Sequence, residues 1–77
     1  MNLENLIGQV MILAVGKTLK IVDVEDGDNL EDIIIKTNNK QTYNLYAAFT
    51  TNLLQFDNKN LNEEFLEFIK TNQSYKE

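Results

Sequence analysis

The feature that most constrains the fold is an apolar stripe near the C-terminus. Large apolar residues recur there at helical spacing, namely Leu61, Phe65, Phe68 and Ile69. This pattern predicts an amphipathic helix over about residues 60–72, with a frayed tail at 73–77. Asn60, followed three residues later by Glu63, indicates a capping box at its start. Burying these side chains contributes about 1.5–3 kcal/mol each, which is comparable to the net stability of so short a chain.

Short runs rich in aliphatic and β-branched residues precede this helix. They predict four to five antiparallel strands between about residues 9 and 56, at 9–15, 19–24, 32–37, 41–46 and 53–56. In the second run, Leu19 and Ile21 share one face, whereas Val22 and Val24 share the other. Either both faces are covered, or a bulge near Ile21 and Val22 bends the strand.

The third and fourth runs predict a hairpin. Asn38 and Asn39 are expected to form a two-residue turn, because Asn tolerates positive φ angles. In the fourth strand, Tyr43 and Tyr46 are expected on opposite faces, so one of them is exposed. An exposed Tyr suits a partner contact, and Tyr46 is the candidate. A helical turn is expected at 47–49, before the last strand.

These elements predict one domain over residues 1–77 with an α+β fold, mainly β, closed by the C-terminal helix. Gly8-x-Val10 at the first strand and Tyr43-x-Leu45-x-Ala47-Ala48-Phe49 before the last resemble small SH3-like β-barrel modules of bacteria and phages. The resemblance covers about residues 6–57 and implies a small barrel or curved sheet with a loop-borne binding surface. The chain lacks the row of exposed aromatic residues that binding of a Pro-rich peptide would need.

Half of the twelve carboxylates lie between Asp23 and Asp32, with no Lys among them, in a chain of net charge −5. One interpretation is a solvated loop that keeps the protein soluble. The other is an acidic surface that imitates the phosphates of DNA and attracts a basic protein. The candidate partner-binding residues are Asp26, Asp28, Glu31, Asp32 and Tyr46. A calcium loop built around Gly27 would begin at Val22, which cannot ligate the ion, so no metal site is predicted.

The composition argues against catalysis and cofactor binding. The chain has no Cys and no His, which removes the commonest nucleophile–base pairs and metal ligands. Gly16-Lys17-Thr18 resembles the end of a phosphate-binding loop, but Met11 stands where that motif needs glycine. We therefore expect no enzyme and no cofactor.

The expected function is that of a non-catalytic protein-interaction module of bacterial or phage origin, with a protein partner. The alternative is an acidic inhibitor that mimics nucleic acid and blocks a basic enzyme. Direct nucleic-acid binding is not expected, because an acidic surface without Arg repels phosphates. No membrane span and no signal peptide are predicted, so the expected compartment is the cytoplasm. Three consecutive Ile in the third strand leave one facing away from the core, so a homodimer is an open alternative.

Overall fold

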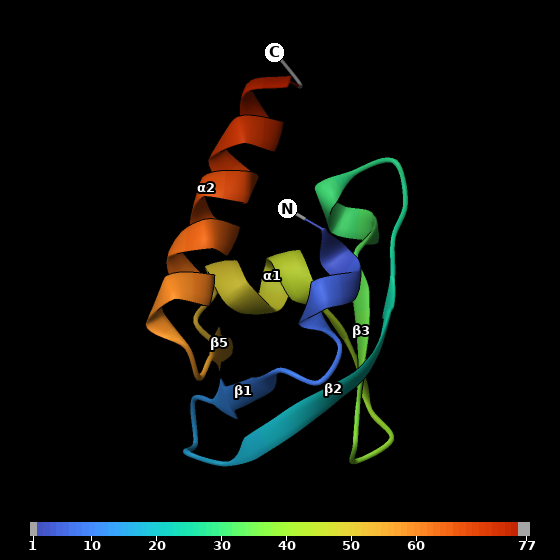
Figure 1. Cartoon of the computed structure of the whole chain (residues 1–77), viewed down its shortest axis with the longest axis vertical. Helices are drawn as coiled ribbons and strands as arrows, with labels where there is room; N and C mark the ends of the chain where they lie inside the picture. The colour runs from blue at the N-terminus through green and yellow to red at the C-terminus, as the bar shows by residue number, and fades with distance from the viewer. Residues whose placement is uncertain (1, 76–77) are drawn as a thin grey trace.

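The computed structural model describes the backbone of residues 2–75 and the side chains of residues 2–71. Five antiparallel strands form one sheet, and a long C-terminal helix packs beside it (Figure 1). The predicted α+β fold, mainly β with a C-terminal helix, is confirmed. The strands are β1 (Val10–Leu13), β2 (Thr18–Glu25), β3 (Ile34–Thr37), β4 (Thr42–Asn44) and β5 (Leu54–Phe56). The helices are the 3₁₀ turns η1 (Leu3–Leu6) and η2 (Leu30–Asp32), and the α-helices α1 (Leu45–Thr50) and α2 (Lys59–Tyr75).

The strand order is β4-β3-β2-β1-β5, and neighbouring strands are all antiparallel. β4 and β5 are therefore the two edges of an open sheet in the described part of the chain. The curved sheet expected from the sequence is compatible with this order, whereas closure into a barrel is not confirmed.

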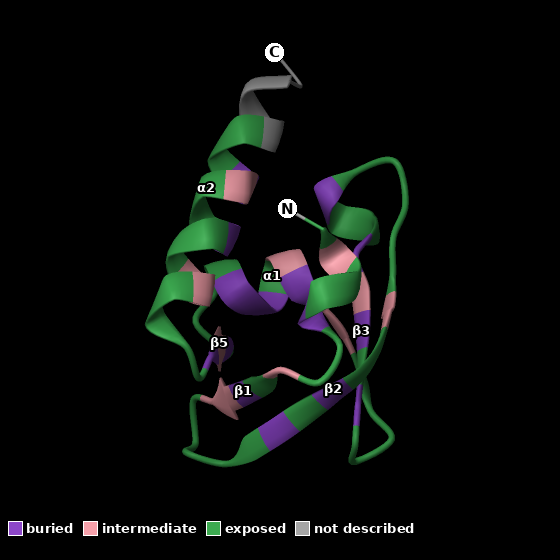
Figure 2. Cartoon of the chain, viewed as in Figure 1, coloured by how far each residue is buried: buried purple, intermediate pink, exposed green. Residues whose placement is uncertain are grey.

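A bulge in β2 explains the change of phase in its sequence. The register between β2 and β3 shifts between Ile21 and Asp23. Leu19 and Ile21 are buried, Val22 is exposed, and Val24 packs against the core beyond the bulge. Figure 2 shows buried and exposed stretches alternating along β2. Of the two alternatives that the sequence leaves open, the bulge is thus the one that the structure shows. It lets β2 pair with β1 through its first half and with β3 through its second half.

The turn between β3 and β4 has three residues rather than the predicted two. Thr37 N donates to Gln41 O at 3.0 Å, and the positive φ falls on Lys40, not on Asn38 or Asn39. The Asn39 side chain has another role, because its Oδ1 accepts hydrogen bonds from the buried Thr37 hydroxyl and from Gln41 N. The prediction of a two-residue Asn turn is therefore wrong.

The fourth strand ends at Asn44, two residues earlier than predicted. Asn44 Oδ1 accepts a hydrogen bond from Ala47 N at 3.1 Å, which caps α1 directly after the strand. Leu45 and Tyr46 are consequently helical, and the placement of Tyr43 and Tyr46 on opposite faces of one strand is wrong. The helical segment expected before β5 is present and buries Leu45, Ala48 and Phe49.

The C-terminal helix is present and begins at Lys59, one residue before the predicted start at about residue 60. Asn58 Oδ1 accepts a hydrogen bond from Leu61 N at 3.2 Å, so Asn58 is the capping residue and the predicted capping box of Asn60 and Glu63 is wrong. The helix continues to Tyr75, into the range predicted to fray, and residues 76–77 lie outside the described residues.

Three phenylalanine rings join α1, β5 and α2 in the core. Phe65 contacts Phe49 edge-on, with ring centroids 4.9 Å apart, and Phe56 at 5.7 Å. Phe49 and Phe56 lie 6.0 Å apart. These separations fall in the range preferred by aromatic pairs. The cluster fixes the helix against the β5 edge of the sheet and so positions the face of α2 described next.

Candidate functional site

A cavity lies between η1, the loop from β2 to η2, and α2. Its volume is about 680 Å³. We call it the acidic groove. It is lined by Asn2, Leu3, Glu4, Val24, Asp26, Gly27, Asp28, Asn29, Leu30, Ile33 and Phe68. Figure 1 shows the three flanking segments, which are far apart in the sequence, above the β1–β2 turn at the bottom of the view.

Apolar side chains form the floor of the acidic groove. Leu30 and Ile33 are buried, and Leu3, Val24 and Phe68 are half-buried and packed against the core. The Phe68 ring also stacks on Phe65, with centroids 5.9 Å apart. The floor is therefore continuous with the core, which holds it in place.

Carboxylates form the rim. Glu4, Asp26 and Asp28 line the groove and are exposed. None of the described lining residues is Lys, and the chain contains neither Arg nor His. The rim is therefore negative, and none of the described lining residues supplies a cation to balance it.

A shallower hollow continues the groove along α2. It measures about 300 Å³ and is lined by Glu64, Glu67, Phe68 and Thr71. Phe68 belongs to both linings, so the two hollows, each of which contains carboxylates, meet at this residue. The negative rim thus extends from the loop onto the helix.

The predicted site residues separate in the structure. Asp26 and Asp28 line the acidic groove, whereas Glu31, Asp32 and Tyr46 do not. Asp32 Oδ2 accepts a hydrogen bond from Asn29 N at 3.1 Å and so holds the start of η2. Tyr46 lies on α1, half-buried and packed against the core.

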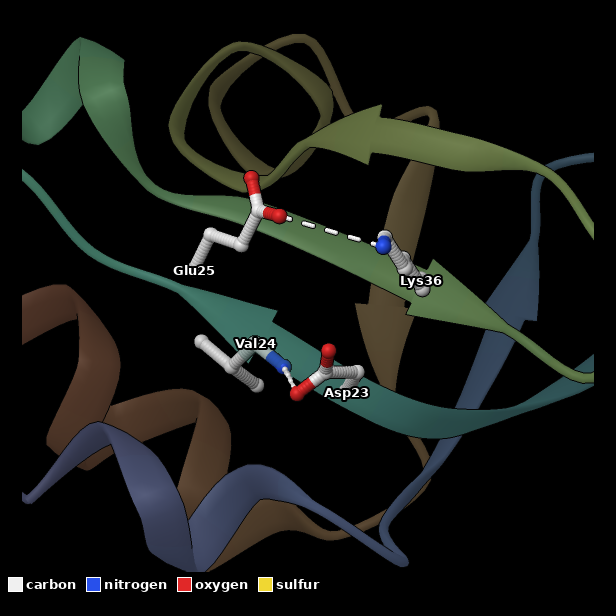
Figure 3. Close-up of polar contacts among 4 residues, drawn as sticks. All are labelled: Asp23, Val24, Glu25 and Lys36. Atoms are coloured by element: carbon white, nitrogen blue, oxygen red, sulfur yellow. Dashed lines mark hydrogen bonds and ion pairs between the residues drawn. The ribbon is translucent and has the colours of Figure 1, made fainter.

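Two other carboxylates of the acidic segment lie against the sheet (Figure 3). Asp23 Oδ1 accepts a hydrogen bond from Val24 N at 2.9 Å, and Glu25 forms an ion pair with Lys36 of the neighbouring strand at 3.8 Å. These two interactions involve only β2 and the neighbouring strand β3. The segment therefore contributes to the groove mainly through the stretch from Asp26 to Asn29.

Sequence reasoning missed Leu3, Glu4 and Phe68 as site residues. Leu3 and Phe68 were visible only as members of apolar stripes, and such residues usually belong to the core. No local signal shows that residues 2–4 and residue 68 flank the same loop. The groove depends on the tertiary arrangement, so a single motif could not reveal it.

A second hollow of about 380 Å³ lies between α1, β5 and α2. Its lining contains four polar uncharged residues, one carboxylate, Glu63, and the apolar Phe49 and Leu66. It carries no concentration of charge. We therefore regard the acidic groove as the stronger candidate.

Within the side chains described, no three carboxylates are arranged to hold a metal ion. No helix of the described residues has the length and apolar character to cross a bilayer. Comparison of the chain with models of protein families, with curated proteins and with solved structures finds no match.

Proposed function

We propose that this chain is a non-catalytic protein-interaction module that receives its partner in the acidic groove. The observation that carries the proposal is the combination, in one cavity, of an apolar floor and a carboxylate rim to which the described lining residues add no cation. Apolar surface supplies binding free energy when it leaves water, and charge at the rim selects the partner and speeds encounter.

The residue types around the groove favour binding over chemistry. The chain offers neither His nor Cys, so an activated nucleophile would have to come from other groups. The carboxylates of the rim are exposed, whereas carboxylate catalysis needs a pair held at a defined separation in a cleft. An interaction surface needs only complementary shape and charge.

The second candidate is an acidic inhibitor that imitates nucleic acid. One observation favours it, because all six carboxylates from Asp23 to Asp32 are exposed. A mimic would use Asp26, Asp28, Glu31 and Asp32 together and would have little use for the apolar floor. The two proposals therefore differ in whether Glu31, outside the groove, contributes to binding.

We also propose that the fold is related to small SH3-like modules. Two features that suggest the relationship are present: the bulge in β2 and the helical segment α1 directly before the last strand. The sheet is open rather than closed, so this relationship would be one of strand arrangement and not of a complete barrel.

The test is affinity capture from a cytoplasmic extract of the host, read by mass spectrometry, with three forms of the protein. These are the wild type, the variant Asp26→Asn/Asp28→Asn, and the control Asp57→Asn/Glu63→Gln, which loses the same charge outside the groove. We expect a partner that wild type and control retain and the groove variant loses. A partner retained equally by all three would contradict the proposal.

Competition with duplex DNA separates the two candidates. A mimic should lose its partner to added DNA and should weaken on Glu31→Gln. The groove proposal predicts that Glu31→Gln leaves capture unchanged.

A further inference from the structure

We propose that the occupant of the acidic groove is a cationic segment of another protein, in which Lys or Arg flanks a large apolar side chain. This inference rests on the proposed function and names the chemistry of the partner. The juxtaposition behind it is the half-buried Phe68, which lines both the groove with its loop carboxylates and the adjoining hollow with the carboxylates of α2.

The apolar floor of the groove is the reason why the bound segment is expected to contain a large apolar side chain. Leu3, Val24, Ile33 and Phe68 come from four different segments and meet at one cavity. A volume of about 680 Å³ lies within the range of about 300–1,000 Å³ that is usual for binding pockets. An aromatic or branched aliphatic side chain that enters the groove would cover this floor and remove it from water.

The rim sets the charge. Phe68 lines one hollow together with Glu4, Asp26 and Asp28, and it lines the neighbouring hollow together with Glu64 and Glu67. A cation beside the apolar anchor would meet carboxylates whichever way the segment runs. Lys and Arg both supply such a cation, and Arg adds a bidentate fork that fits a carboxylate. A nucleic acid or an acidic peptide would be repelled.

A second copy of the chain fits the groove less well than a foreign segment. The turn between β1 and β2 contains Lys17 and also Val15, the most exposed of the large apolar residues described. It therefore combines a cation with an apolar side chain, as the proposed foreign segment does. This turn lies at the far end of the molecule from the groove (Figure 1). Insertion would therefore be head-to-tail, and such contacts build chains or rings that grow with concentration rather than a closed dimer.

In the experiment, peptides that bind the wild-type protein are selected from a phage-displayed library of random twelve-residue peptides. We expect enriched sequences that place Lys or Arg within two residues of Phe, Leu, Ile or Trp. The synthetic consensus peptide is then measured by fluorescence polarisation. Asp26→Asn/Asp28→Asn should weaken its binding about 3- to 10-fold, as expected for two exposed ion pairs, and added salt should weaken it further. The control Asp57→Asn/Glu63→Gln should bind as the wild type does.

Three results would overturn the inference. The first is a consensus without cations, or no consensus at all. The second is equal affinity of the peptide for wild type and groove variant. The third is concentration-dependent assembly of the protein alone, seen by sedimentation velocity and abolished by the groove variant, because the occupant would then be a second copy.

The affinity capture with the groove variant distinguishes a failure of this inference from a failure of the proposed function. If a captured partner depends on the groove but binds it through an uncharged segment, the inference fails and the proposed function stands. If capture does not depend on the groove, the proposed function fails first.

Discussion

The side-chain amide of Asn62 pairs with both backbone groups of Phe56. Phe56 N donates to Asn62 Oδ1 at 2.9 Å, and Asn62 Nδ2 donates to Phe56 O at 3.0 Å. Phe56 ends the edge strand β5, and Asn62 lies in the first turn of α2. The amide thus takes the place of a neighbouring strand, which protects an otherwise open sheet edge and attaches the helix to it.

We predict that Asn62→Ala destabilises the protein by about 1–3 kcal/mol, because two half-buried backbone groups lose their partners. Asn62→Asp should also destabilise it, since the carboxylate keeps the acceptor but has no N–H to donate to Phe56 O. Urea denaturation followed by circular dichroism measures both. The exposed neighbour Glu63→Gln is the control, and an Asn62→Ala variant as stable as this control would contradict the role.

Removal of the Phe65 ring should unfold most of the protein. The side chain has no exposed surface and contacts Phe49 and Phe56 edge-on. Truncation of a buried Phe to Ala costs about 3–5 kcal/mol, which approaches the lower end of the stability of small domains. Thermal melting of Phe65→Ala against Leu66→Ala, whose side chain is 45% exposed, tests this. Similar melting temperatures for the two variants would contradict the cluster's role.

Gly27 should not tolerate a side chain. A Cβ at this position would lie 2.5 Å from Asp32 Cβ, so the loop at the rim of the groove would have to move. We expect Gly27→Ala to destabilise the fold by about 1–3 kcal/mol, as other overpacked sites do. Amide chemical shifts from Asp26 to Asp32 should move with it. The exposed neighbour variant Asp28→Ala should leave the stability nearly unchanged, and a Gly27→Ala variant as stable as this control would refute the close approach.

The Glu25–Lys36 ion pair should contribute little. Its atoms are 3.8 Å apart, and the two side chains are 59% and 47% exposed. Exposed pairs of this kind are worth about 0.2–1 kcal/mol and weaken further in salt. We therefore expect a double-mutant cycle of Glu25→Gln and Lys36→Met to give a coupling of at most about 1 kcal/mol in urea denaturation. A larger coupling would mean that the pair is shielded from solvent.

The elements that the sequence predicts well are those whose signal is spread over many residues. The stripe from Leu61 to Ile69 predicts a helix, and the phase change in β2 indicates either a bulge or two covered faces. Helix caps and turns that depend on the side chain of a single Asn were predicted poorly. The chain has eleven Asn, and nearly all of them can cap a helix or enter a turn by local criteria. Asn44 ends a strand and caps a helix, Asn39 binds Thr37, and Asn62 covers an edge, and each of these roles depends on tertiary neighbours. The acidic groove could not be predicted from the sequence for the same reason, because Glu4, Asp28 and Phe68 meet only in the folded chain.

The choice between Asn58 and Asn60 as the cap of α2 gives a direct test of that distinction. Asn58 Oδ1 accepts from Leu61 N at 3.2 Å, whereas Asn60 is an exposed residue inside the first turn. Asn58→Ala should therefore cost about 1 kcal/mol, the usual cost of a lost N-cap. Asn60→Ala should change stability by less than about 0.5 kcal/mol, or raise it slightly, because Ala is the better helix former. Urea denaturation of the matched pair measures the difference. If Asn60→Ala were the more damaging substitution, Asn60 would be the cap of α2, as the local sequence pattern predicts. The hydrogen bonds between Asn62 and Phe56, which are formed with Asn58 as the cap, would then be in doubt.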